Sequence, residues 1–267
     1  MTQIPQAAPA GFRVTHLNRF AQGGRWRTEA MRSYRQPVLI WFTRGQGRIT
    51  VSGVTRGYGP HNLVFLPAGT MHGFDTPGQV FGSVVFLPPD PALMLPDQAL
   101  HLRFRDSTQQ NELTGLIDAL AREIEGNLPA RERALHYRAG LVAVWIERQI
   151  AQMPEITTPP DASRRLAAAY SALIEQDLTS GRSVAEYAAV LGVSPTHLSR
   201  ACNIASGRPA SALLADRILF EARRLLSETR LPVGDIAAAL GFTSAAYFTR
   251  SFHRQTGLTP TQFRAQA

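Results

Sequence analysis

The sequence has 267 residues, of which 44% are hydrophobic and 18% are charged. This length is sufficient for two domains that each bury their own core. No apolar run approaches the roughly 18 residues that a membrane span needs, so we expect no membrane role. The N-terminal stretch lacks the basic-then-apolar order of a secretory signal. We therefore expect the protein to remain in the cytoplasm.

The positive charge consists entirely of arginine. The chain has 28 arginines, no lysine and 20 acidic residues, which gives a net charge of +8. Such a charge favours a polyanionic partner. The first sixty residues hold nine of the arginines and one acidic residue, Glu29. This excess suggests an anionic effector such as a small carboxylate, although an arginine-rich solvated surface explains it equally well.

Residues 38–86 predict a small antiparallel barrel or sandwich. The runs VLIWF, GRITV, LVFLP and VFGSVVF are rich in β-branched and aromatic residues, and glycine and proline turns separate them. After a proline-rich stretch, residues 108–125 and 131–152 carry apolar residues at helical spacing. Two amphipathic helices are therefore expected to follow the strands. Residues 153–162, with proline and threonine but no periodicity, predict a linker.

From residue 163 onward the pattern is helical and contains an internal duplication. In each unit an apolar helix ends at a glycine, Gly192 or Gly241, and a serine cap then opens a second helix. Arg200 and Arg250 lie at equivalent positions in those second helices. This arrangement predicts two helix-turn-helix units whose second helices offer donors to base edges in successive major-groove segments. The repeated apolar positions are Val184, Tyr187, Ala188 and Leu191, then Val233, Ile236, Ala237 and Leu240.

The C-terminal motifs resemble a known family. They are Arg217, Ala222, Leu225 and Leu226 between the units, IAAALGF at 236–242, YFTRSF at 247–252 and GLTPTQFR at 257–264. With these motifs, residues 163–267 resemble the DNA-binding domain of the AraC family. The first unit departs from the family pattern at 201–204, where ACNI replaces a bulky aromatic residue and basic residues. The resemblance implies a transcription regulator, expected to be an activator, that binds double-stranded DNA and contacts RNA polymerase.

The resemblance also implies which residues contact DNA. Arginine can pair with guanine through two hydrogen bonds, whereas Ala246 offers only a methyl contact to thymine. Serines at helix N-termini and a nearby arginine suit phosphate. Base-edge contacts are expected from Thr196, Ser199, Arg200, Ala246, Thr249 and Arg250, and phosphate contacts from Ser194, Ser244 and Arg254.

The segment 59–72 resembles the second motif of the cupin barrel, with Pro67, Gly69 and His72 in the P-x-G-x-x-H pattern. Metal-binding cupins add a histidine pair and a glutamate from the preceding motif, and residues 38–53 contain neither residue type. Because one imidazole cannot make a metal site, we expect no metal and no cofactor, and His72 is either a pocket hydrogen-bonder or a core histidine. A metal-dependent cupin enzyme is the rival function, but it lacks these ligands. No catalytic triad or carboxylate pair is evident either, so we expect no enzyme.

Cys202 is the single cysteine, which excludes an internal disulfide and a cysteine-rich zinc site. We expect it to act as a small buried hydrophobe.

Together these patterns predict an α+β chain with two domains. Residues 1–152 would form a cupin-like barrel with two flanking helices, and residues 163–267 an all-α double helix-turn-helix domain. The helices after the barrel are either a lid or a dimer seam, and we favour a homodimer whose seam includes Trp145 and Ile146. A small-molecule effector would bind in the barrel, unless the barrel is packed solid and serves a protein signal or dimerisation alone. The expected effector residues are Trp41, His72, Phe74 and Phe81.

Overall fold

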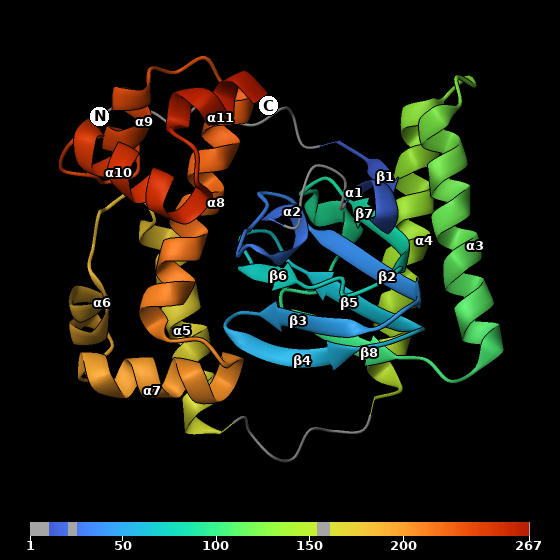
Figure 1. Cartoon of the computed structure of the whole chain (residues 1–267). Coiled ribbons are helices and arrows are strands. Elements are labelled where there is room, and N and C mark those ends of the chain that lie inside the picture. The colour runs from blue at the N-terminus through green and yellow to red at the C-terminus, as the bar shows by residue number, and fades with distance from the viewer. Residues whose placement is uncertain (1–10, 21–25, 154–160, 267) are drawn as a thin grey trace.

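The N-terminal part of the chain is built from two antiparallel sheets. The computed structural model describes residues 11–20, 26–153 and 161–266 (Figure 1). One sheet has the strand order β1-β7-β2-β5-β8 and the other has the order β4-β3-β6. The strands are β1 (Arg13–His16), β2 (Val38–Arg44), β3 (Gly47–Val51), β4 (Val54–Tyr58), β5 (Asn62–Leu66), β6 (His72–Phe74), β7 (Phe81–Phe86) and β8 (Leu100–Arg103). Short helices lie at α1 (Leu17–Phe20), α2 (Trp26–Glu29) and η1 (Pro91–Leu93).

The predicted α+β class is confirmed, with one difference in the strand region. Among the described residues the strands form two sheets that face each other, and these are not closed into one hydrogen-bonded barrel. The space between the sheets is filled by a core that includes Ile49, Val64 and Phe74. The cupin-like region is therefore a sandwich with a packed interior.

Strand β2 is buried on both faces. Val38, Ile40 and Phe42 belong to the core between the two sheets. Leu39 and Trp41 point the other way and belong to a second core, formed with the helices that follow the strands. Because neighbouring side chains on a strand alternate between its faces, a strand covered on both sides has a continuous apolar run such as VLIWF.

Helices α3 (Ser107–Glu125) and α4 (Arg131–Ala151) cover the outer face of the five-stranded sheet. They match the predicted ranges to within one residue at each end, and Asp106 caps α3 by accepting from the Thr108 amide. Trp145 and Ile146 are 5% and 0% exposed and pack in the core under this sheet. The prediction that these two residues form a dimer seam is therefore wrong, because the sheet uses that face of α4.

The C-terminal part is entirely helical within the described residues. It has two apolar cores, one around Tyr170, Tyr187 and Leu198 and the other around Leu225 and Phe248. The long helix α8 contributes to both cores, so it joins the two units. The helices are α5 (Ala162–Asp177), α6 (Val184–Val190), α7 (Pro195–Ser206), α8 (Ala210–Glu228), α9 (Val233–Ala239), α10 (Ala245–Thr256) and α11 (Pro260–Gln266).

The two parts of the chain pack against each other. Figure 1 shows the helical part on the side of β3, β4 and β6, and α3 and α4 on the opposite side of the sandwich. The Thr55 hydroxyl donates to the carbonyl of Ser206 over 3.1 Å, and the Met31 amide donates to Asp216 over 2.9 Å. Met31 and Met71 also join the first helical core. Most of the predicted linker, at 154–160, lies outside the described residues, and the proposed domain boundaries stay a prediction.

Candidate nucleic-acid interface

The two helix-turn-helix units have the same turn. Gly192 and Gly241 both have a positive φ, of 68° and 76°. After each glycine the next amide returns to the preceding helix: Val193 donates to the carbonyl of Ala188 and Phe242 to that of Ala237, both over 3.0 Å. Only glycine adopts this backbone region without strain. The predicted duplication is therefore present in the backbone as well as in the sequence.

The second helices, α7 and α10, begin and end alike. Ser194 accepts from the amide of His197 and Ser244 from that of Tyr247, each over 3.2 Å. Each hydroxyl keeps its own hydrogen available for an external acceptor such as phosphate. Both helices end at a left-handed glycine, Gly207 or Gly257.

One face of each second helix is buried and the other is exposed. Leu198 and Cys202 fill the core of the first unit, and Phe248 and Phe252 fill that of the second. The buried hydrophobe expected at Cys202 is confirmed, and burial raises the pKa of its thiol to about 11. Of the predicted DNA contacts, Ser199 and Thr249 are half-buried, whereas Ser194, Thr196, Arg200, Ser244, Ala246, Arg250 and Arg254 are exposed.

The exposed arginines of these helices form no ion pair in the described part of the chain. Within residues 161–266 no ion pair involves Arg200, Arg250 or Arg254. Arginines elsewhere in the helical part do form ion pairs, as Arg208 does with Asp216 over 3.0 Å. The guanidinium groups on α7 and α10 are therefore available to an external acceptor.

Sequence reasoning missed further exposed side chains on the same faces. Asn203 and His253 lie three residues beyond Arg200 and Arg250 and are exposed. Residues three apart on a helix share a face, so each lies beside its arginine. Extending the i, i+3 pattern by one turn would have found them.

The two units also touch each other directly, through Gly181 before α6 and Gly241 after α9. A β-carbon placed on Gly241 would lie 2.4 Å from both the amide nitrogen and the α-carbon of Gly181. Both glycines have a positive φ, of 70° and 76°. Since neither position leaves room for a side chain, this contact holds the turn of the second unit against the first.

A buried ion network joins helices α5 and α8. Arg217 on α8 pairs with Glu175 on α5 over 2.7 Å and with Glu221 over 3.1 Å. Ser33 of the N-terminal part accepts from Arg217 over 3.2 Å and donates to Glu175 over 2.5 Å. Burial alone would raise the pKa of Glu221, but Arg217 and Arg224 outweigh it and lower that pKa. The network therefore stays charged and ties α5, α8 and the strand domain together.

The four predicted effector residues do not meet in one cavity. Phe74 lies in the core between the sheets. His72 is 2% exposed, faces the ring of Tyr34, and bonds through Nδ1 to the carbonyl of Thr70 over 2.9 Å. Burial and the nearby Arg32 lower the pKa of His72 to about 3, which keeps the ring neutral near pH 7. These surroundings match the core-histidine interpretation.

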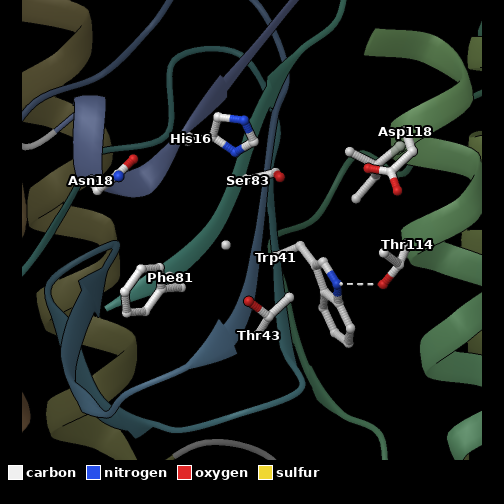
Figure 2. A pocket seen from close by; sticks show the side chains of 10 residues that line it. His16, Asn18, Trp41, Thr43, Phe81, Ser83, Thr114 and Asp118 are labelled. Atoms are coloured by element: carbon white, nitrogen blue, oxygen red, sulfur yellow. Dashed lines mark hydrogen bonds between the residues drawn. The ribbon is translucent and has the colours of Figure 1, made fainter. Parts of the chain in front are cut away.

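Trp41 and Phe81 do line a common pocket of about 400 Å³. It lies between the outer face of the five-stranded sheet and α3, on the side away from the packed interior (Figure 2). No arginine lines this pocket, so it does not support the anionic effector suggested by the N-terminal arginines. The lining residues are His16, Asn18, Trp41, Thr43, Phe81, Gly82, Ser83, Thr114, Ile117 and Asp118.

The described residues contain no group of three or more histidine, cysteine or acidic side chains placed to hold a metal ion. No helix among them is long and apolar enough to cross a membrane.

Comparison with known proteins places the C-terminal part in a family. A helix-turn-helix domain family matches residues 187–266. The arabinose operon regulatory protein of Salmonella typhimurium is 32% identical over 119 residues, which are 44% of this chain and 42% of that protein. The virulence regulon transcriptional activator VirF of Yersinia enterocolitica is 30% identical over 91 residues, 34% of each protein. The chain therefore matches less than half the length of either relative.

A solved structure of ToxT from Vibrio cholerae is similar over 95% of this chain and 96% of its own, with 14% identity and a TM-score of 0.43. The relatives matched in sequence are named as regulators, and the matched helix-turn-helix family covers most of the duplicated units described above. Residues 187–266 therefore form a helix-turn-helix domain, and the chain is similar over part of its length to these transcription regulators.

Proposed function

We propose that this protein regulates transcription by placing α7 and α10 in two consecutive major-groove segments of one DNA site. This proposal rests on two helices with the same serine cap, each of which presents an exposed arginine that forms no ion pair with the described residues. Because α8 and the contact of Gly181 with Gly241 fix α7 relative to α10, we expect the two helices to enter groove segments about 34 Å apart on one face of the duplex. Thr196, Ser199, Ala246 and Thr249 would add base-edge contacts, and Ser194, Ser244 and Arg254 would contact phosphate.

Replacing Arg200 or Arg250 by alanine tests this assignment. We expect each change to weaken binding by about 1–3 kcal/mol and to relax base preference at one position only, with the two positions about ten base pairs apart. Arg250 should matter more, because its unit keeps the family pattern. Binding-site selection at fixed salt on the wild type and both variants measures this. Unchanged base preferences, with affinity reduced evenly across sequences, would leave both arginines as phosphate contacts.

We also propose that the protein acts as a homodimer through the solvent face of α4. Tyr137, Leu141 and Val144 lie along this face and are 68%, 57% and 40% exposed. Their spacing of four and three residues aligns them as one apolar stripe. The resemblance to regulators that bind as pairs supports a second copy of this chain as the partner.

The dimer proposal predicts that replacing Leu141 and Val144 together by glutamate gives a folded monomer. Two carboxylates in an apolar seam would have to be desolvated without partners. Light scattering measures the mass, and Leu128→Glu, which alters an exposed leucine off the stripe, is the matched control. An unchanged dimeric mass for the double variant would place the seam elsewhere.

We further propose that the protein responds to an effector, activates transcription and contacts RNA polymerase. The family resemblance supports an activator that acts in the cytoplasm on a signal received by the strand domain. The pocket at Trp41 and Phe81 supports a small-molecule signal over a strand domain that serves dimerisation alone.

A further inference from the structure

The pocket beside α3 has a composition that selects among ligand classes. Its volume, about 400 Å³, falls in the range of small-molecule sites. Trp41 and Ile117 form buried apolar walls at 1% and 2% exposure, and Phe81 is 38% exposed. Figure 2 shows Phe81 and Trp41 of the sheet on one side and Thr114 and Asp118 of α3 on the other. A ligand here would contact both the sheet and the helix.

The indole donor of Trp41 is already used. Its Nε1 donates to the Thr114 hydroxyl over 3.2 Å, and that hydroxyl donates to the carbonyl of Gln110 over 2.8 Å. This chain of bonds fixes the ring and uses its one donor, so Trp41 offers a ligand only the aromatic surface that lines the pocket. Aromatic faces attract cations because their electron density is concentrated above and below the ring.

The ionisable side chains of the lining are Asp118 and His16. Asp118 is the one carboxylate among the lining residues, and it is exposed and takes part in no ion pair within the described part of the chain. The lining has no arginine, although the chain has 28. The guanidinium of Arg44 does lie over the Phe81 ring, 5.8 Å from its centroid, so that ring already accepts a cation on one face. Polar groups of Thr43 and Ser83 add hydrogen-bonding partners.

We infer that this pocket binds a small organic cation, an ammonium compound with a flat apolar body, and that this compound is the effector. The body would lie against Trp41 and Phe81 and the ammonium group would pair with Asp118. The inference rests on the proposed regulatory function. Since α3 packs against α4, a ligand wedged between the sheet and α3 would act on the same helix pair that carries the proposed dimer stripe.

Three probes with one body and different charges test the ligand class. Phenethylamine, 2-phenylethanol and phenylacetate are titrated into the full chain by calorimetry at neutral pH. We expect phenethylamine to bind at least fivefold more tightly than the alcohol, and phenylacetate to bind most weakly. Equal affinities, tighter binding of the anion, or no binding of any probe at millimolar concentration would overturn the inference.

Variants locate the site. Asp118→Asn should remove the preference for the amine and leave binding of the alcohol unchanged, and Phe81→Ala should weaken all three probes. Glu147→Gln, which neutralises an exposed carboxylate on α4, is the control and should bind like wild type. An amine preference that survives Asp118→Asn would also overturn the assignment. DNA binding by Asp118→Asn without ligand should match wild type, which separates a failure of this inference from a failure of the DNA-binding proposal.

Discussion

Replacing Arg217 by methionine is expected to lower the free energy of unfolding by about 3–5 kcal/mol. Arg217 is 4% exposed and pairs with two carboxylates that are themselves nearly buried. Removing one partner of a buried ion network leaves uncompensated charges, and this costs far more than a surface ion pair contributes. Urea unfolding of the full chain, followed by circular dichroism, measures the loss.

The matched control is Arg200→Met, the same chemical change at an exposed arginine, and we expect it to alter stability by less than about 0.5 kcal/mol. Adding Glu175→Gln and Glu221→Gln to Arg217→Met should recover part of the loss, because the unpaired charges are then gone. Equal losses for Arg217→Met and Arg200→Met would show that the network does not hold α5 to α8.

The second large effect is expected at Gly241. Replacing it by alanine places a β-carbon 2.4 Å from the backbone of Gly181, so one helix-turn-helix unit must move relative to the other. We expect affinity for a full DNA site to fall at least tenfold, or about 1.4 kcal/mol, because two helices that must enter successive groove segments would no longer be in register. Quantitative gel-shift titration on a selected site measures this change.

Gly192 supplies the control, since it occupies the equivalent turn of the first unit. Its φ is also positive, +68°, but a β-carbon there would meet no atom within 4 Å. Gly192→Ala therefore carries only the cost of a left-handed alanine, about 1 kcal/mol of stability, and should keep most DNA affinity. If the two variants bind equally well, the contact between Gly181 and Gly241 does not set the spacing of the units.

Local sequence patterns predicted the elements that depend on residues near each other in the sequence. The helix-turn-helix duplication needs only i, i+3 and i+4 spacing, glycine turns and serine caps, so Gly192, Gly241, Ser194 and Ser244 could be assigned. The pairing of Arg217 with Glu175 could not be predicted, because the two residues are far apart in the chain and meet only when α5 packs on α8.

The positions of the candidate effector residues also depend on contacts that the sequence pattern could not predict. Alternation along β2 predicts that Trp41 and its neighbours in sequence lie on opposite faces of the strand. It does not predict which face packs against the opposing sheet and which packs against α3. Phe74 and Trp41 consequently lie on opposite sides of the five-stranded sheet. On α4, helical spacing identified apolar residues without telling that Trp145 faces the sheet and Leu141 faces solvent.

We propose above that one chain reads two groove segments with two equivalent helices. Missing-nucleoside interference on a selected site tests it most directly, because it reports each base whose removal weakens binding. We predict two clusters per bound chain, centred about ten base pairs apart, with one cluster lost in Arg200→Ala and the other in Arg250→Ala. A single cluster that both variants affect alike would contradict the account.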